Sequence, residues 1–118
     1  MADLKVTTPL TFEPIFMERI WGGRRLETEF AKILPPNVRI GESWEIVDRP
    51  DAQSVVTNGS LRGKTLRELW TENRREIFGP VPDAPRFPLL IKLLDAQEKL
   101  SLQVHPPQAV AVPDQELL

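Results

Sequence analysis

The chain has 118 residues and a formal net charge of −2, with 41% hydrophobic and 27% charged residues. This balance is typical of one globular domain, and the weak negative charge argues against nucleic acid or an anionic membrane as a partner. The chain contains no Cys, so disulfides are excluded and any metal must be held by imidazole, carboxylate or amide groups. We expect a cytoplasmic protein without a membrane span, because no apolar run approaches the required ~18 residues and the first eight residues lack a signal-peptide core.

The first elements expected along the chain are an extended segment and a short helix. Residues 4–20 are broken by Pro9 and Pro14 and are rich in Thr, Ile and Phe, which favours an extended run along a sheet edge. Residues 24–34 carry one apolar stripe of helical spacing, made of Leu26, Phe30, Ile33 and Leu34. This second segment predicts a short helix that ends before two prolines.

A strand with a buried charge is expected next. Residues 38–46 alternate between apolar and polar side chains as a strand does, and Trp44 lies on the apolar face. Glu42 interrupts that face. A carboxylate in such a place must be paired or must line a cavity. Glu42 therefore either forms a salt bridge with an arginine or belongs to a functional site.

A hairpin and a long helix follow. Residues 53–57 predict a short strand, and Asn58-Gly59 is typical of a type I′ turn. The segment Thr65–Glu68 has the spacing of a capping box, and residues 66–78 carry a helical apolar stripe. We expect one helix over 66–78.

The last part of the chain predicts a second hairpin. Residues 89–94 are apolar except for one lysine, which indicates a strand covered on both faces, and residues 99–105 alternate as a strand does. A turn of two or four residues would pair these strands so that four polar side chains share one face, whereas a three-residue turn would send the lysine to the other face. These four residues are Lys92, Ser101, Gln103 and His105.

The shared face admits two interpretations. The Cα atoms of Gln103 and His105 should lie about 7 Å apart, which lets an amide oxygen and an imidazole nitrogen converge on one metal ion. A lone histidine is, however, more often an ordinary partly buried residue, and a lone lysine usually reaches solvent.

Four sequence strings carry a family resemblance: Trp21-Gly-Gly, Gly41-Glu-Ser-Trp-Glu, Phe87-Pro-Leu-Leu-Ile-Lys-Leu-Leu-Asp-Ala and Leu100-Ser-Leu-Gln-Val-His-Pro. Together they resemble the N-terminal signature of type I phosphomannose isomerases, which are zinc-dependent cupin enzymes that interconvert mannose 6-phosphate and fructose 6-phosphate. The resemblance covers residues 9–107. It implies a mainly β fold with short helices (α+β), as an incomplete cupin or jelly-roll barrel built from the N-terminal strands plus two helices.

The resemblance also implies roles for individual residues. Zn²⁺ would be held by Gln103 and His105, and the further Glu and His ligands of the family have no recognisable counterpart in this chain. Zinc would act as a Lewis acid on the sugar oxygens. Lys92 would supply positive charge to the reaction. The substrate-binding residues implied are Trp21, Glu42, Trp44 and Ser101.

We therefore expect residues 1–118 to form one partial domain with an atypical tail over 108–118. The expected function is that of an N-terminal fragment of an isomerase that acts on a sugar phosphate and is inactive alone. Two alternatives remain: a non-catalytic cupin-like binding domain completed by a partner chain, and a non-functional truncated product. An incomplete sheet would leave an open edge, which favours self-association.

Overall fold

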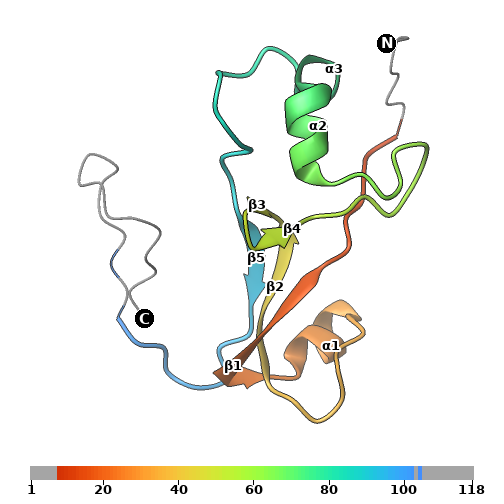
Figure 1. Ribbon diagram of the computed structural model, residues 1–118. Helices are drawn as coiled ribbons and strands as arrows, with labels where there is room; N and C mark the ends of the chain where they lie inside the picture. Colours follow the sequence, from red (N-terminus) through yellow and green to blue (C-terminus); the bar gives the residue numbers. More distant parts are fainter. Residues whose placement is uncertain (1–7, 103, 105–118) are drawn as a thin grey trace.

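The computed structural model describes residues 8–102 and residue 104. Its elements in chain order are β1 (Ile15–Gly23), α1 (Arg25–Phe30), β2 (Ile40–Ile46), β3 (Asp48–Arg49), β4 (Ala52–Gln53), α2 (Leu66–Glu72), α3 (Arg74–Phe78) and β5 (Ile91–Leu94). In Figure 1, α1 lies beside one end of the main sheet and α2 with α3 lies beyond the other end. Both sheets of the described residues are open, and the expected mainly β fold with short helices and no closed barrel is confirmed.

The main sheet has three antiparallel strands in the order β1-β2-β5, so β2 is its centre. The register places Trp44 of β2 opposite Ile15 on one side and Lys92 on the other. The predicted strand over 38–46 is confirmed, and β1 runs along an edge as expected. The β1–β2 ladder is irregular: both Glu18 and Gly23 face Ile40, so residues 19–22 leave the regular ladder.

A small core joins α1 to this sheet. Leu26, Leu34 and Ile40 are buried together, and Phe16, Val38 and Leu93 pack against them. The helix is shorter than the predicted 24–34 because Ala31 takes up a left-handed conformation with φ of 55°, which ends it after Phe30. As a result, Phe30 and Ile33 are 56% and 91% exposed and do not join the stripe that their spacing predicts.

A second core lies under α2 and α3. Val56, Leu61 and Leu69 are buried there, and Leu10, Phe12, Ile77 and Phe78 pack against them. The predicted capping box is confirmed: the backbone N–H of Glu68 donates to Thr65 Oγ1 at 3.1 Å, and the backbone N–H of Thr65 donates to Glu68 Oε1 at 3.0 Å. The single helix predicted over 66–78 is two helices, because Asn73 has non-helical backbone angles of φ −133° and ψ 31°. Asn is a poor helix former, since its side chain competes for backbone hydrogen bonds.

The type I′ turn predicted at Asn58-Gly59 is wrong. Such a turn needs positive φ at both central residues, and Gly59 has φ of 69° while Asn58 is not among the positive-φ residues of the described chain. Asn58 instead uses its side chain: Oδ1 accepts the backbone N–H of Thr11 at 2.9 Å, and Nδ2 donates to the Pro9 carbonyl at 3.0 Å. Residues 55–65 form a longer loop closed by a bridge between Val55 and Thr65.

The predicted hairpin between residues 89–94 and 99–105 is also wrong in its described part. β5 pairs with β2, and residues 99–102 are not in a strand. After β5 the chain turns toward β1, because the backbone N–H groups of Gln97 and Glu98 donate to the Trp21 carbonyl at 2.9 and 3.1 Å. β5 is thus an edge strand in the part described, and Ile91 is 45% exposed rather than covered. The rest of the predicted hairpin, and the tail over 108–118, lie outside the described residues.

No helix within residues 8–102 is long and apolar enough to cross a membrane.

Candidate functional site

A buried carboxylate on the central strand is the centre of the candidate site. Glu42 of β2 is only 4% exposed. Its Oε1 accepts the indole N–H of Trp44 at 2.8 Å and lies 3.0 Å from the ammonium nitrogen of Lys92, and its Oε2 accepts the Nε–H of Arg19 at 3.2 Å. One carboxylate therefore joins three donors from β1, β2 and β5. We name Arg19, Glu42, Trp44 and Lys92 the Glu42 cluster.

The strand register explains how these residues meet. Lys92 is directly opposite Trp44 in the β2–β5 ladder, and side chains directly opposite in an antiparallel pair lie on the same face. Glu42 and Trp44 are two residues apart on one strand, so they share that face as well. The ammonium group of Lys92 lies 5.9 Å from the Trp44 ring centroid, and the guanidinium of Arg49 lies 5.5 Å from it. The indole of Trp44 is thus near two cations, each within the distance of a cation–π contact.

The electrostatics keep Glu42 ionised. Burial raises the pKa of this carboxyl group, but the hydrogen bond from Trp44 and the charges of Lys92 and Arg19 outweigh it and hold the pKa below its ordinary value. A carboxylate with occupied oxygens and a lowered pKa is a poor proton acceptor near neutral pH. Glu42 is therefore suited to fix the positions of the two cations rather than to act as a base.

A glycine makes room for the arginine. A Cβ at Gly41 would lie 2.6 Å from Cβ of Arg19 and 2.7 Å from Cζ3 of Trp21. Real Cβ atoms do not approach other atoms so closely, so only glycine lets these side chains cross β2 beside Glu42. A Cβ at Gly22 would lie 2.5 Å from the backbone nitrogen of Gly41, so the two backbones also touch. The Trp-Gly-Gly string of β1 and the Gly-Glu-Ser-Trp string of β2 therefore pack directly against each other through their glycines.

The structure brings together three of the predicted site residues and places a fourth beside them. Glu42, Trp44 and Lys92 are in direct contact, and Trp21 borders Arg19 across Gly41. Ser101 is exposed and outside any strand. The two predicted metal ligands, Gln103 and His105, lie outside the described residues, so their roles stay predictions.

One of the two interpretations of Glu42 from the sequence was a salt bridge with an arginine. This salt bridge is present, because Arg19 pairs with Glu42. The sequence did not identify which arginine would do so. Arg19 lies two residues before the Trp21-Gly-Gly string, and its closeness to that string was the available signal. Arg49 was missed as a neighbour of Trp44, and its position three residues after the end of β2 offered no pattern to find it.

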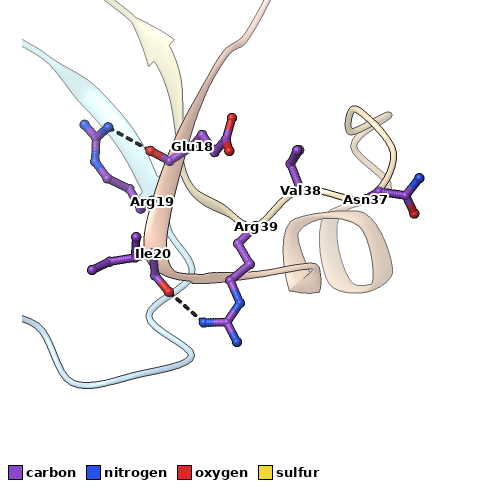
Figure 2. A pocket seen from close by; sticks show the side chains of 6 residues that line it. All are labelled: Glu18, Arg19, Ile20, Asn37, Val38 and Arg39. Atoms are coloured by element: carbon purple, nitrogen blue, oxygen red, sulfur yellow. Dashed lines mark hydrogen bonds between the residues drawn. The ribbon is translucent and has the colours of Figure 1, made fainter.

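A separate hollow of about 380 Å³ lies on the β1 side and is lined by Glu18, Arg19, Ile20, Asn37, Val38 and Arg39. Figure 2 shows that Arg19 and Arg39 point to different sides of β1, where they donate to the carbonyls of Glu18 and Ile20. Their guanidinium groups do not converge on one ligand. We therefore place the candidate site at the Glu42 cluster and not in this hollow.

The described residues do not by themselves fit a metal site. Among them no group of three or more His, Asp or Glu side chains could hold an ion. Glu42 is already occupied by three donors, so its oxygens are not open for coordination. Stable tetrahedral zinc sites in proteins use three or four protein ligands.

Comparison with solved structures defines the class of this fold. The chain superposes on the structure described as "Crystal Structure Analysis of the Mannose 6-Phosphate Isomerase from Bacillus subtilis" with a TM-score of 0.81 and 46% sequence identity. The match covers 89% of this chain and 32% of that one. The fold is thus that of part of a sugar-phosphate isomerase structure.

The sequence comparisons give the family. Residues 10–116 match the family described as "Phosphomannose isomerase type I, catalytic domain". Mannose-6-phosphate isomerase ManA of Bacillus subtilis (strain 168) is 50% identical over 100 residues, which cover 85% of this chain and 30% of that protein. The mannose-6-phosphate isomerase of Streptococcus mutans serotype c is 45% identical over 105 residues, which cover 85% and 32%. The chain belongs to the type I phosphomannose isomerase family, as its sequence strings predicted, and spans about a third of the length of these relatives.

Proposed function

We propose that this chain forms the N-terminal part of the active site of an aldose–ketose isomerase that interconverts mannose 6-phosphate and fructose 6-phosphate. The observation that carries the proposal is the Glu42 cluster, in which a buried carboxylate holds a lysine and an arginine beside an indole. The relatives' names supply the substrate.

The cluster provides positive charge at a fixed place. Isomerisation of an open-chain sugar moves a proton between C1 and C2, and negative charge develops on the attached oxygens. Preorganised cationic donors stabilise such charge. The Lys92 side chain is 26% exposed, so its ammonium group keeps access to solvent while Glu42 holds it at 3.0 Å. Lys92 donates to a substrate oxygen or to the phosphate, and Glu42 and Trp44 position it.

The zinc ligands Gln103 and His105 are part of the proposal. Support comes from the resemblance of the Gln-Val-His-Pro string and from the chemistry of an imidazole nitrogen and an amide oxygen, both of which bind metals. With two ligands the affinity of this chain for zinc should be weak. A zinc titration at about pH 7.5 of the wild type and His105→Ala tests it, because metal binding requires the neutral imidazole. Tight binding that survives the loss of His105 would place the metal elsewhere. A cytoplasmic location stays a prediction.

A chimera tests the function directly. Residues 10–107 of this chain would replace the matching segment of Bacillus subtilis ManA, which is 50% identical over 100 residues. We expect the chimera to convert mannose 6-phosphate in a coupled assay. Lys92→Met in the chimera should lower kcat/KM by about 10²-fold, as loss of a charge-stabilising donor does. Lys99→Met is the matched control, because Lys99 is exposed and outside the cluster. Equal activity of the two variants would contradict the role of Lys92.

The chain alone should be inactive, because it spans about a third of its relatives. Zinc-dependent conversion of mannose 6-phosphate by the purified 118-residue chain would overturn this expectation.

A partner-completed binding domain is the second candidate, and the edge strand β5 favours it. Leu89, Ile91 and Leu94 are 58%, 45% and 49% exposed beside an edge that no described strand covers. Such an edge invites pairing with another chain. A molecular mass that rises with concentration in sedimentation analysis would support this candidate and self-association.

A further inference from the structure

A hollow of about 420 Å³ lies beside α2 and α3. Small-molecule sites in proteins usually have about 300–1,000 Å³, so the hollow has the size of such a site. Helix α3 contributes Arg74 and Arg75 to its lining, and the loop after this helix contributes Gly79, Val81 and Asp83. Figure 1 shows α2 and α3 beyond one end of the main sheet, and the lining shares no residue with the Glu42 cluster.

One of the two arginines is held in place before any ligand binds. Arg74 donates from Nε to the Trp70 carbonyl at 3.2 Å and from Nη1 to Asp83, and its guanidinium carbon lies 4.5 Å from the centroid of the Trp70 ring. Its Nη2 makes no hydrogen bond with any described residue. A fixed cation with an open donor group binds an anion without the cost of ordering the side chain.

The second arginine has no partner in the described part of the chain. Arg75 is exposed, and its side chain makes no hydrogen bond or ion pair with a described residue. The charged side chains of the described lining are Arg74, Arg75 and Asp83, which gives one net positive charge. The Asp83 side chain is 96% exposed, and exposed ion pairs are weak because water screens them. An anion with more charge than a carboxylate can therefore displace Asp83 from Arg74.

We propose that this hollow binds a phosphate group, which accepts hydrogen bonds from Nη2 of Arg74 and from the guanidinium of Arg75. Phosphate oxygens match the planar fork of an arginine, and charge-assisted hydrogen bonds of this kind are the strong ones. The group belongs either to a free phosphate ion or to a small phosphate monoester, and the hollow has room for the carbon skeleton of the latter. The inference is independent of the proposed isomerase function.

Other classes of ligand suit the lining less well. The net positive charge disfavours a cation. The lining is mainly polar, and Trp70, its largest apolar member, is 2% exposed, so no aromatic surface is open to an apolar ligand. A carboxylate carries one negative charge, whereas a phosphate monoester carries about 1.5–2 near neutral pH and competes better with Asp83.

The experiment is a titration of the ¹⁵N-labelled 118-residue chain with sodium phosphate, followed by the amide signals of Arg75, Gly79 and Val81. We expect saturable shifts, whereas sodium chloride and sodium acetate at the same ionic strength should cause none. Arg75→Gln should weaken phosphate binding about tenfold through loss of a charge-assisted hydrogen bond. Arg62→Gln is the matched control, because Arg62 is exposed and outside the lining, and its affinity should equal that of the wild type.

A further variant should change the affinity in the opposite direction. Asp83→Asn removes the carboxylate that competes for Arg74 and should tighten phosphate binding about threefold, as loss of an exposed like charge does. A variant that binds more tightly than the wild type has not lost its fold, so this measurement separates a role in binding from a role in folding.

A second ligand separates the two sources of the phosphate group. If glycerol 3-phosphate binds more tightly than inorganic phosphate, the site is for a phosphate monoester; if inorganic phosphate binds at least as tightly, the site is for the free ion. The proposal is overturned if the wild type shows no saturable shift with either ligand, or if chloride or acetate causes the same shifts. It is also overturned if Arg75→Gln binds phosphate as tightly as the wild type, or if Asp83→Asn fails to bind it more tightly.

Discussion

The region of α2 and α3 and the three-stranded sheet bury different kinds of side chain. Under α2 the fully buried residues are apolar, with Leu66, Leu69 and Trp70 between 0% and 2% exposed. The Trp70 ring meets Phe78 and Phe87 at centroid distances of 5.0 and 5.7 Å. These contacts are typical of a core whose main role is stability.

The sheet, in contrast, buries polar groups at its centre and exposes apolar groups at its edge. Glu42 and Ser43 of the central strand are 4% and 0% exposed, while Ile91 and Leu94 of β5 are half exposed. Buried charges cost stability unless they are paired, and the pairing here uses residues from three strands. The comparison shows that α2 buries only apolar side chains, whereas the central strand of the sheet also buries the charged group of the candidate site.

The largest expected effect comes from the helical core. Leu69→Ala removes a side chain with no exposed surface and should lower the free energy of unfolding by about 2–5 kcal/mol. Urea unfolding measures it, with Arg75→Ala as an exposed control that should stay within about 0.5 kcal/mol. If the two variants have the same free energy of unfolding, the apolar core under α2 contributes little to the stability of the chain.

A smaller loss of stability is expected at Gly41, where the side chains of Arg19 and Trp21 pack against β2. Gly41→Ala places a Cβ 2.6 Å from Cβ of Arg19, so strand β1 must move. Forcing an extra methyl group into packed structure costs about 1–3 kcal/mol. Thermal unfolding would show the loss, and Ser60→Ala, in an exposed turn, is the control. If Gly41→Ala is as stable as the control, the contact of Gly41 with Arg19 and Trp21 does not require glycine at this position.

The helix cap gives the next effect. Thr65→Ala removes the acceptor for the Glu68 backbone N–H and should cost about 1 kcal/mol. Thr71→Ala in the same helix is the matched control, because Thr71 is exposed and caps no free N–H group. The capping box would be dispensable if the unfolding midpoint fell for Thr71→Ala and not for Thr65→Ala.

These regions also differ in how well the sequence predicts them. The capping box and the apolar stripe of α2 depend on residues within a few positions of one another, so spacing alone identifies them. The break at Asn73 was not predicted, because the apolar period continues across it. The wrong turn at Asn58 has a similar origin: its side chain is used by residues near Pro9, far away in the sequence.

The sheet is formed by strands that are far apart in the sequence, and the sequence predicted their pairing less well. It identified Glu42 as an anomaly and offered a salt bridge with an arginine as one reason, which the contact with Arg19 supplies. It paired Lys92 with the wrong strand, because a hairpin between adjacent segments is the simplest topology for such a pattern. In the structure β5 pairs with β2 some fifty residues earlier, and that register brings Lys92 to Glu42. The family strings contain three of the four residues of the Glu42 cluster, namely Glu42, Trp44 and Lys92.

The smallest expected effect is the pH dependence of the Glu42 cluster, and it tests whether the sheet depends on this charge. The pKa of Glu42 is lower in the folded chain than its ordinary value, so the carboxylate binds a proton less readily when folded than when unfolded. Its contribution to stability is fully present above the unfolded pKa of about 4.3 and is lost as the pH falls through the lower folded pKa. The difference in stability between the wild type and Glu42→Gln should therefore be larger at pH 7 than at about pH 3. The change in this stability difference between the two pH values should stay below about 1 kcal/mol, because the side chains of Arg19 and Lys92 are 24% and 26% exposed and water screens their charges.

Urea unfolding of the wild type and Glu42→Gln at both pH values measures this change, with Glu72→Gln, on the exposed side of α2, as the control for general acid effects. A gap that is the same at both values of pH would show that Glu42 acts through its shape and hydrogen bonds alone, and that the sheet does not rely on its charge.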